Sequence, residues 1–76
     1  MTDKDAGEPR AILVDLLLRK VAADTYPSNT MMDYLEELLL PDEVPAYVAV
    51  LAQKVRDDTY PSISMLRRLV DLSRPA

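Results

Sequence analysis

The sequence predicts an all-α protein, a small four-helix domain built from two repeated helix–turn–helix hairpins. Good helix formers dominate the 76 residues, and a single glycine argues against a β-rich fold with many turns. Apolar residues recur at helical spacing along the chain. The segment 20–35 returns as 54–69 with nine of 16 positions identical. We interpret this 34-residue offset as an internal duplication.

The polar residues 1–8 show no periodicity, and we expect a flexible N-terminal arm there. Residues 9–76 are expected to form a single helical domain. Repeat one covers about 9–41 and repeat two about 42–76. Two repeats are too few for a stable solenoid, so a closed domain with approximate internal twofold symmetry is expected.

In the first repeat, a helix is expected from Pro9 to about Ala23, because proline suits the first turn. The residue before Pro27 is forced out of the α region, which ends this helix. A second helix follows the N-cap Ser28 and runs to about Leu39. The predicted core faces are Ile12, Leu13, Leu16, Leu17 and Val21, then Met31, Met32, Leu35, Leu38 and Leu39, with Tyr34 on the flank.

In the second repeat, Asp42 is predicted to cap a third helix that tolerates Pro45 in its first turn. Pro61 repeats the break, and a fourth helix is expected from Ile63 to about Leu72. The predicted core faces are Tyr47, Val48, Leu51 and Val55, then Met65, Leu66, Leu69 and Leu72.

The repeated string Asp-Thr-Tyr-Pro-Ser is predicted to build a helix-joining corner twice. Its residues are Asp24, Tyr26, Pro27 and Ser28 in one copy, and Asp58, Tyr60, Pro61 and Ser62 in the other. Each serine caps the next helix, each proline begins a hydrophobic staple, and each tyrosine ring covers the open end of its hairpin. The aspartates either pair with the lysine four residues earlier or accept an amide bond in an Asx-turn.

The first helix is apolar over about 240° of its circumference, far beyond an ordinary surface helix. Val14, Leu18 and Val21 widen the arc, and we predict that this strip is a protein interface; simple burial is the alternative. The copies also differ in charge. The second predicted helix carries Asp33, Glu36 and Glu37. Its counterpart, the fourth predicted helix with the residues just after it, carries Arg67, Arg68 and Arg74. These faces are either solvated, paired within the monomer or in contact between subunits; phosphate binding by the arginines is a further alternative.

Without His or Cys, the chain lacks the usual bases, nucleophiles and zinc ligands, so we expect no catalytic site, metal or cofactor. A net charge of −4 argues against nucleic-acid binding. No apolar run reaches the length of a membrane span, and no signal peptide is visible. The expected location is the cytoplasm, or the virion if a phage encodes the chain.

The prediction for function is a non-enzymatic protein–protein interaction module. It either self-associates as a homo-oligomer or acts as a small adaptor or assembly component. The alternative is a small helical DNA-binding regulator that uses Arg67 and Arg68. Six arginines against three lysines and the absence of Phe suggest a GC-rich genome, such as that of an actinobacterium or one of its phages.

Overall fold

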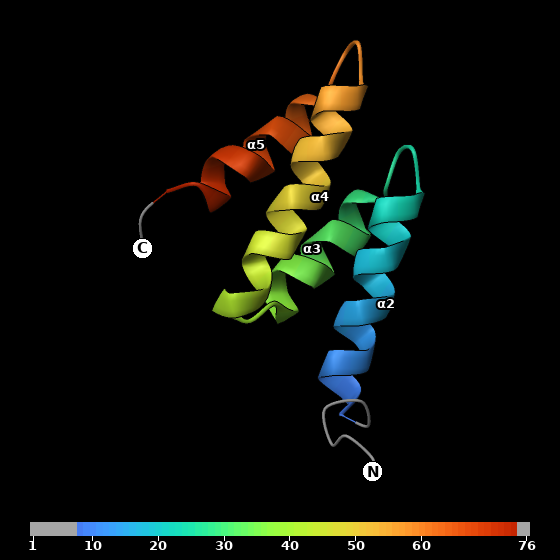
Figure 1. Ribbon diagram of the computed structural model, residues 1–76, viewed down its shortest axis with the longest axis vertical. Coiled ribbons are helices and arrows are strands. Elements are labelled where there is room, and N and C mark those ends of the chain that lie inside the picture. The colour runs from blue at the N-terminus through green and yellow to red at the C-terminus, as the bar shows by residue number, and fades with distance from the viewer. Residues whose placement is uncertain (1–7, 75–76) are drawn as a thin grey trace. The chain divides into compact units, whose positions relative to one another are not determined.

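In the computed structural model, which describes residues 8–74, the secondary structure is entirely helical. This range contains four α-helices and a short 3-10 helix, η1, ahead of the third of them (Figure 1). The elements are α2 (Pro9–Ala23), α3 (Asn29–Leu38), η1 (Pro41–Glu43), α4 (Val44–Asp57) and α5 (Ile63–Leu72). The predicted arm lies outside the described residues, except for Glu8, which is the N-cap residue of α2.

The chain divides into two compact units, one ending at Pro41 and the other beginning at Asp42. In the first unit α2 packs against α3, and in the second α4 packs against α5. Each unit is therefore a helical hairpin with a short corner between its helices (Figure 1). The division falls where the boundary between the two repeats is predicted. That both units belong to a single domain stays a prediction.

The two corners have closely similar local geometry. The hydroxyl of Ser28 accepts a 3.2 Å hydrogen bond from the amide of Met31, and Ser62 accepts an equal bond from Met65. The backbone at these serines is extended, with ψ of 135° and 132°, as N-cap residues require. The caps predicted at Ser28 and Ser62 are therefore present, and each fixes the start of its helix.

The corner aspartates act through their backbone. The amide of Asp24 donates to the carbonyl of Lys20 at 3.0 Å, and the amide of Asp58 donates to that of Lys54 at 3.2 Å. Each bond closes the last turn of a helix, and ψ of 133° and 135° then turns the chain out of the helix. The two side-chain roles predicted for these aspartates stay predictions.

The start of α4 differs from the prediction. Asp42 lies inside η1, and the N-cap position belongs to Glu43, whose backbone is helical with φ −92° and ψ −18°. A 3-10 turn that begins at Pro41 leads directly into α4, so Asp42 never has the extended backbone that a side-chain cap needs. Pro45 stands in the first turn of α4, as predicted.

The buried side chains among residues 8–74 are all hydrophobic. They are Val14, Val21, Met32 and Leu35 in the first unit, and Tyr47, Leu51 and Met65 in the second. On α3, α4 and α5 these lie on the predicted core faces. The other residues of those faces are half-buried: Met31, Leu38, Leu39, Val48, Val55, Leu66, Leu69 and Leu72.

The predicted core face of α2 is wrong in large part. Val21 is buried and Leu17 is half-buried, but Ile12, Leu13 and Leu16 are exposed. Because apolar residues surround most of α2, periodicity alone does not select one face. The face that packs on α3 also carries Arg10, whose Nη1 donates a 3.0 Å hydrogen bond to the carbonyl oxygen of Leu38.

Candidate functional site

Three large aliphatic side chains of α2 lie exposed on one side of the helix. Ile12, Leu13 and Leu16 are 51%, 41% and 52% exposed, and we call them the apolar patch. At about 100° per residue, the three lie within about 100° of one another around the helix axis. The buried residues Val14 and Val21 point about 130–150° away from the centre of this group. The apolar patch therefore faces away from the side of α2 that is buried.

The exposed strip predicted on Val14, Leu18 and Val21 requires correction. Val14 is 6% exposed, Val21 is fully buried, and Leu18 is half-buried. These residues form the packed side of α2, which agrees with the alternative of simple burial. Sequence reasoning assigned the apolar patch to the core instead. No periodic signal in the sequence separates the two sides of α2, because both sides satisfy helical spacing.

Charged side chains lie near both ends of the apolar patch. The Arg19 Nε lies 3.1 Å from the Asp15 carboxylate in an exposed i, i+4 ion pair. The Arg10 Nε lies 3.6 Å from the Glu8 carboxylate. Lys20, beyond the C-terminal end of the patch, is exposed. An apolar centre with a charged rim is the composition of many protein-binding surfaces.

The acidic residues predicted at an interface lie on α3. Asp33 and Glu37 are exposed, and Glu36 is half-buried. Their predicted basic counterparts belong to the other unit, so contact between the two sets stays a prediction.

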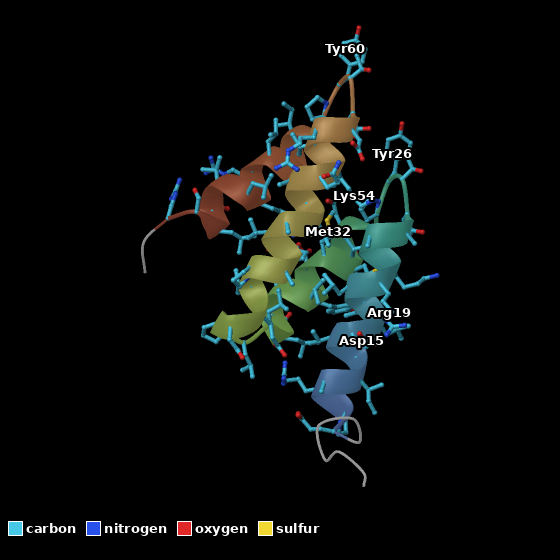
Figure 2. The ribbon with its side chains drawn as sticks, viewed as in Figure 1. Asp15, Arg19, Tyr26, Met32, Lys54 and Tyr60 are labelled. Carbon is cyan, nitrogen blue, oxygen red and sulfur yellow. The ribbon has the colours of Figure 1, made fainter. Side chains whose placement is uncertain are left out.

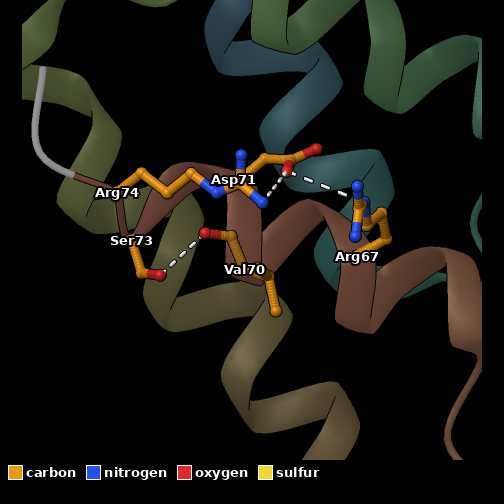
Figure 3. A network of polar contacts seen from close by, with 5 residues as sticks. All are labelled: Arg67, Val70, Asp71, Ser73 and Arg74. Atoms are coloured by element: carbon orange, nitrogen blue, oxygen red, sulfur yellow. Dashed lines mark hydrogen bonds and ion pairs between the residues drawn. The ribbon is translucent and has the colours of Figure 1, made fainter.

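The predicted basic residues are close to an acidic one. The Nε of Arg67 and the Nη2 of Arg74 lie 3.7 Å and 3.9 Å from the same carboxylate oxygen of Asp71 (Figure 3). Arg68 is half-buried. The Asp71 carboxylate offsets part of the positive charge of α5, which weakens the attraction that a phosphate group would feel.

The corner tyrosines do not cover their hairpins. Tyr26 is 84% exposed and Tyr60 is 91% exposed, and both rings stand at the tips of the corners (Figure 2). Pro27 and Pro61 are half-buried instead. Proline fixes the backbone at these corners and the serines cap the following helices, so the tyrosine rings are free to point outward.

Between residues 8 and 74, no group of three or more acidic residues is arranged to hold a metal ion. No helix in the same range is long and apolar enough to cross a membrane. The hydroxyls of Ser28 and Ser62 accept the helix-cap hydrogen bonds, and the Ser62 Oγ also lies 2.8 Å from the Ser64 Oγ.

Comparison of the chain with known protein families, with curated proteins and with solved structures finds no match. The function is therefore inferred from the residues and their geometry.

Proposed function

We propose that the protein is a non-enzymatic protein-binding module and that the apolar patch of α2 is its binding surface. The observation that carries this proposal is the clustering of Ile12, Leu13 and Leu16, each about half exposed, on one side of a single helix. Contiguous exposed apolar surface is characteristic of interaction sites, whereas single exposed apolar residues are not. The module then acts by self-association or as a small adaptor in an assembly.

The small core supports this proposal. Within residues 8–74, seven hydrophobic side chains are buried, whereas nine large hydrophobic side chains are exposed. A chain of this size without cysteine often depends on a partner subunit for part of its stability. Full burial of one Leu or Ile side chain is worth about 1.5–3 kcal/mol, so covering the apolar patch would add appreciably to the stability of the hairpin.

We also infer that the two hairpins are copies of one unit. The identical positions in segments 20–35 and 54–69 support this, as do the equal cap bonds at Ser28 and Ser62. The copies differ at the patch, where Ile12, Leu13 and Leu16 correspond to Ala46, Tyr47 and Val50 at the 34-residue offset, and Tyr47 is buried whereas Leu13 is exposed. A binding surface on the first copy alone would account for Ile12 and Leu16, which are larger than Ala46 and Val50.

The DNA-binding alternative receives no comparable support. Arg67 and Arg74 share the carboxylate of Asp71, and the chain carries a net charge of −4. Proteins that bind duplex DNA through phosphates usually carry a basic surface.

The test is copurification with the tagged chain from the cells that express it. The double variant Ile12→Glu/Leu16→Glu makes the patch acidic, and Ile63→Glu is the matched control, because Ile63 is 79% exposed on the other hairpin. We expect the double variant to keep its helical circular dichroism and lose the bound protein, while the control keeps both. Loss of helix content in the double variant, or unchanged binding, would contradict the proposal.

A further inference from the structure

We propose that the apolar patch binds the same patch of a second copy of this chain, with the two α2 helices antiparallel about a twofold axis. This inference rests on the proposed function and names its partner. Twofold symmetry requires a surface that is complementary to itself. Three features of α2 meet this requirement: the order of its apolar side chains, the charges at the ends of the patch and the direction of the helix.

The apolar side chains interdigitate in the antiparallel arrangement. The patch is centred between positions 13 and 14, so a residue i on one helix lies at about the level of 27 − i on the other. Leu16, Leu13 and Ile12 of the partner subunit then lie at about levels 11, 14 and 15. Levels 14 and 15 fall in the gap between Leu13 and Leu16 of the first chain, and level 11 falls just before Ile12. Each side chain enters a space that the other helix leaves open, as in packed helix pairs.

The charges beside the patch are complementary in the same arrangement. Glu8 is the N-cap residue before α2, and Arg19 lies beyond the C-terminal end of the patch. One residue is at each end and their signs are opposite. An antiparallel pair places Glu8 at about the level of the partner's Arg19 along the seam, and the twofold axis repeats this juxtaposition of opposite charges.

Glu8 and Arg19 can exchange their ion pairs within one chain for ion pairs between two chains. Glu8 and Arg19 have side chains 45% and 78% exposed, and they pair with Arg10 at 3.6 Å and with Asp15 at 3.1 Å. Exposed ion pairs of this kind contribute little and rearrange readily.

A parallel pair is disfavoured by charge. It would bring Arg19 and Lys20 of both chains together at one end of the seam, where four cations repel one another. It would also align the two helix macrodipoles, whereas the antiparallel pair opposes them.

Cysteine cross-linking tests both the partner and the direction, because the chain contains no cysteine. A disulfide needs Cα atoms within about 7 Å, and in an antiparallel pair only a position near the axis meets its own copy. Leu13→Cys lies near the axis. Ala23→Cys, on the same side of α2, is separated from its copy by about 28 Å along the seam, since nineteen residues rise about 1.5 Å each. Ile63→Cys, on the other hairpin, measures how much covalent dimer random collision between chains produces.

We expect Leu13→Cys to give about tenfold more covalent dimer than Ala23→Cys or Ile63→Cys, as held proximity raises the effective concentration. An equal mixture of Glu8→Cys and Arg19→Cys should form mixed dimers in preference to either homodimer. Circular dichroism of each reduced variant confirms that α2 is folded.

Two outcomes would overturn the proposal. Equal cross-linking at Ala23→Cys and Leu13→Cys would show a parallel pair. Cross-linking of Leu13→Cys no greater than that of Ile63→Cys would show that no second copy occupies the patch. In that case, the proposed function still holds if the wild-type chain copurifies with a different protein and the Ile12→Glu/Leu16→Glu variant does not. An unfolded double variant would remove the proposed function as well.

Discussion

The guanidinium of Arg10 donates a 3.0 Å hydrogen bond to the carbonyl oxygen of Leu38, 28 residues later in the chain. Leu38 is the last residue of α3, where carbonyl groups lack partners within the helix and where positive charge is favourable. The position 34 residues after Arg10 is Val44, so the second hairpin lacks an arginine there. This contact ties the start of α2 to the end of α3.

We expect Arg10→Met to lower the free energy of unfolding by about 1 kcal/mol. Bonds that involve a charged group are worth about 1.5–3 kcal/mol, and the 25% exposure of the side chain reduces that value. Methionine keeps the apolar stem of the side chain. The control is Arg67→Met, which removes an exposed ion pair on the other hairpin and should change stability by no more than about 0.5 kcal/mol. Urea denaturation followed by circular dichroism measures both; equal losses would contradict the role of Arg10.

Each serine cap should have a similar effect on stability. Ser28→Ala and Ser62→Ala remove cap hydrogen bonds of equal length, so each should cost about 1 kcal/mol; Ser62→Ala also removes an exposed 2.8 Å hydrogen bond to the Ser64 hydroxyl, which adds little. Ser28→Asp retains an acceptor at the cap and should preserve most of the stability. Thermal unfolding of the three variants checks this expectation. A loss at one corner alone would mean that the two corners differ despite their matching geometry.

The corner tyrosines should contribute little to the fold. Tyr26→Ser and Tyr60→Ser are expected to change the free energy of unfolding by no more than about 0.5 kcal/mol, because both rings are almost fully exposed. Tyr47, in contrast, is fully buried on α4, and Tyr47→Ala should cost about 3–5 kcal/mol. Chemical denaturation of the three variants compares them. If Tyr26→Ser were as destabilising as Tyr47→Ala, the ring would have a structural role after all.

Adjacent residues on α2 should respond in opposite ways to the same substitution. Val14→Glu places an unpaired charge at a position that is 6% exposed, and we expect it to unfold the first hairpin. Leu13→Glu introduces the charge on the exposed side and should leave the helix content unchanged. Far-ultraviolet circular dichroism at low protein concentration separates the two results. The reverse order would show that the apolar patch is the core side of α2.

Local signals in the sequence were sufficient to predict the bounds of most helices. Pro9 starts α2, Pro27 and Pro61 follow the ends of α2 and α4, and Ser28 and Ser62 cap the helices that follow. These effects act within a few residues, so they are readable without the tertiary structure. The cap at Asp42 was wrong because a 3-10 turn replaces the extended backbone that such a cap requires.

The orientation of α2 depended on information that the periodicity of the helix does not contain. With apolar residues around most of α2, either Ile12 with Leu16 or Val14 with Val21 satisfies helical spacing. The contact between Arg10 and Leu38 spans 28 residues, so no local pattern predicts it. On α5 and in the last turns of α4, polar residues occupy the opposite side, and the predicted core faces there hold the buried Tyr47, Leu51 and Met65.

The solution mass over a concentration series tests the central claim most directly, namely that the apolar patch of α2 is an interface with a second copy. We expect light scattering to show a rise from the 8.6 kDa monomer to twice that mass. The Ile12→Glu/Leu16→Glu variant should remain at 8.6 kDa with its helix content intact. A wild-type chain that stays monomeric at every concentration, or a dimer that this variant leaves unchanged, would contradict the claim.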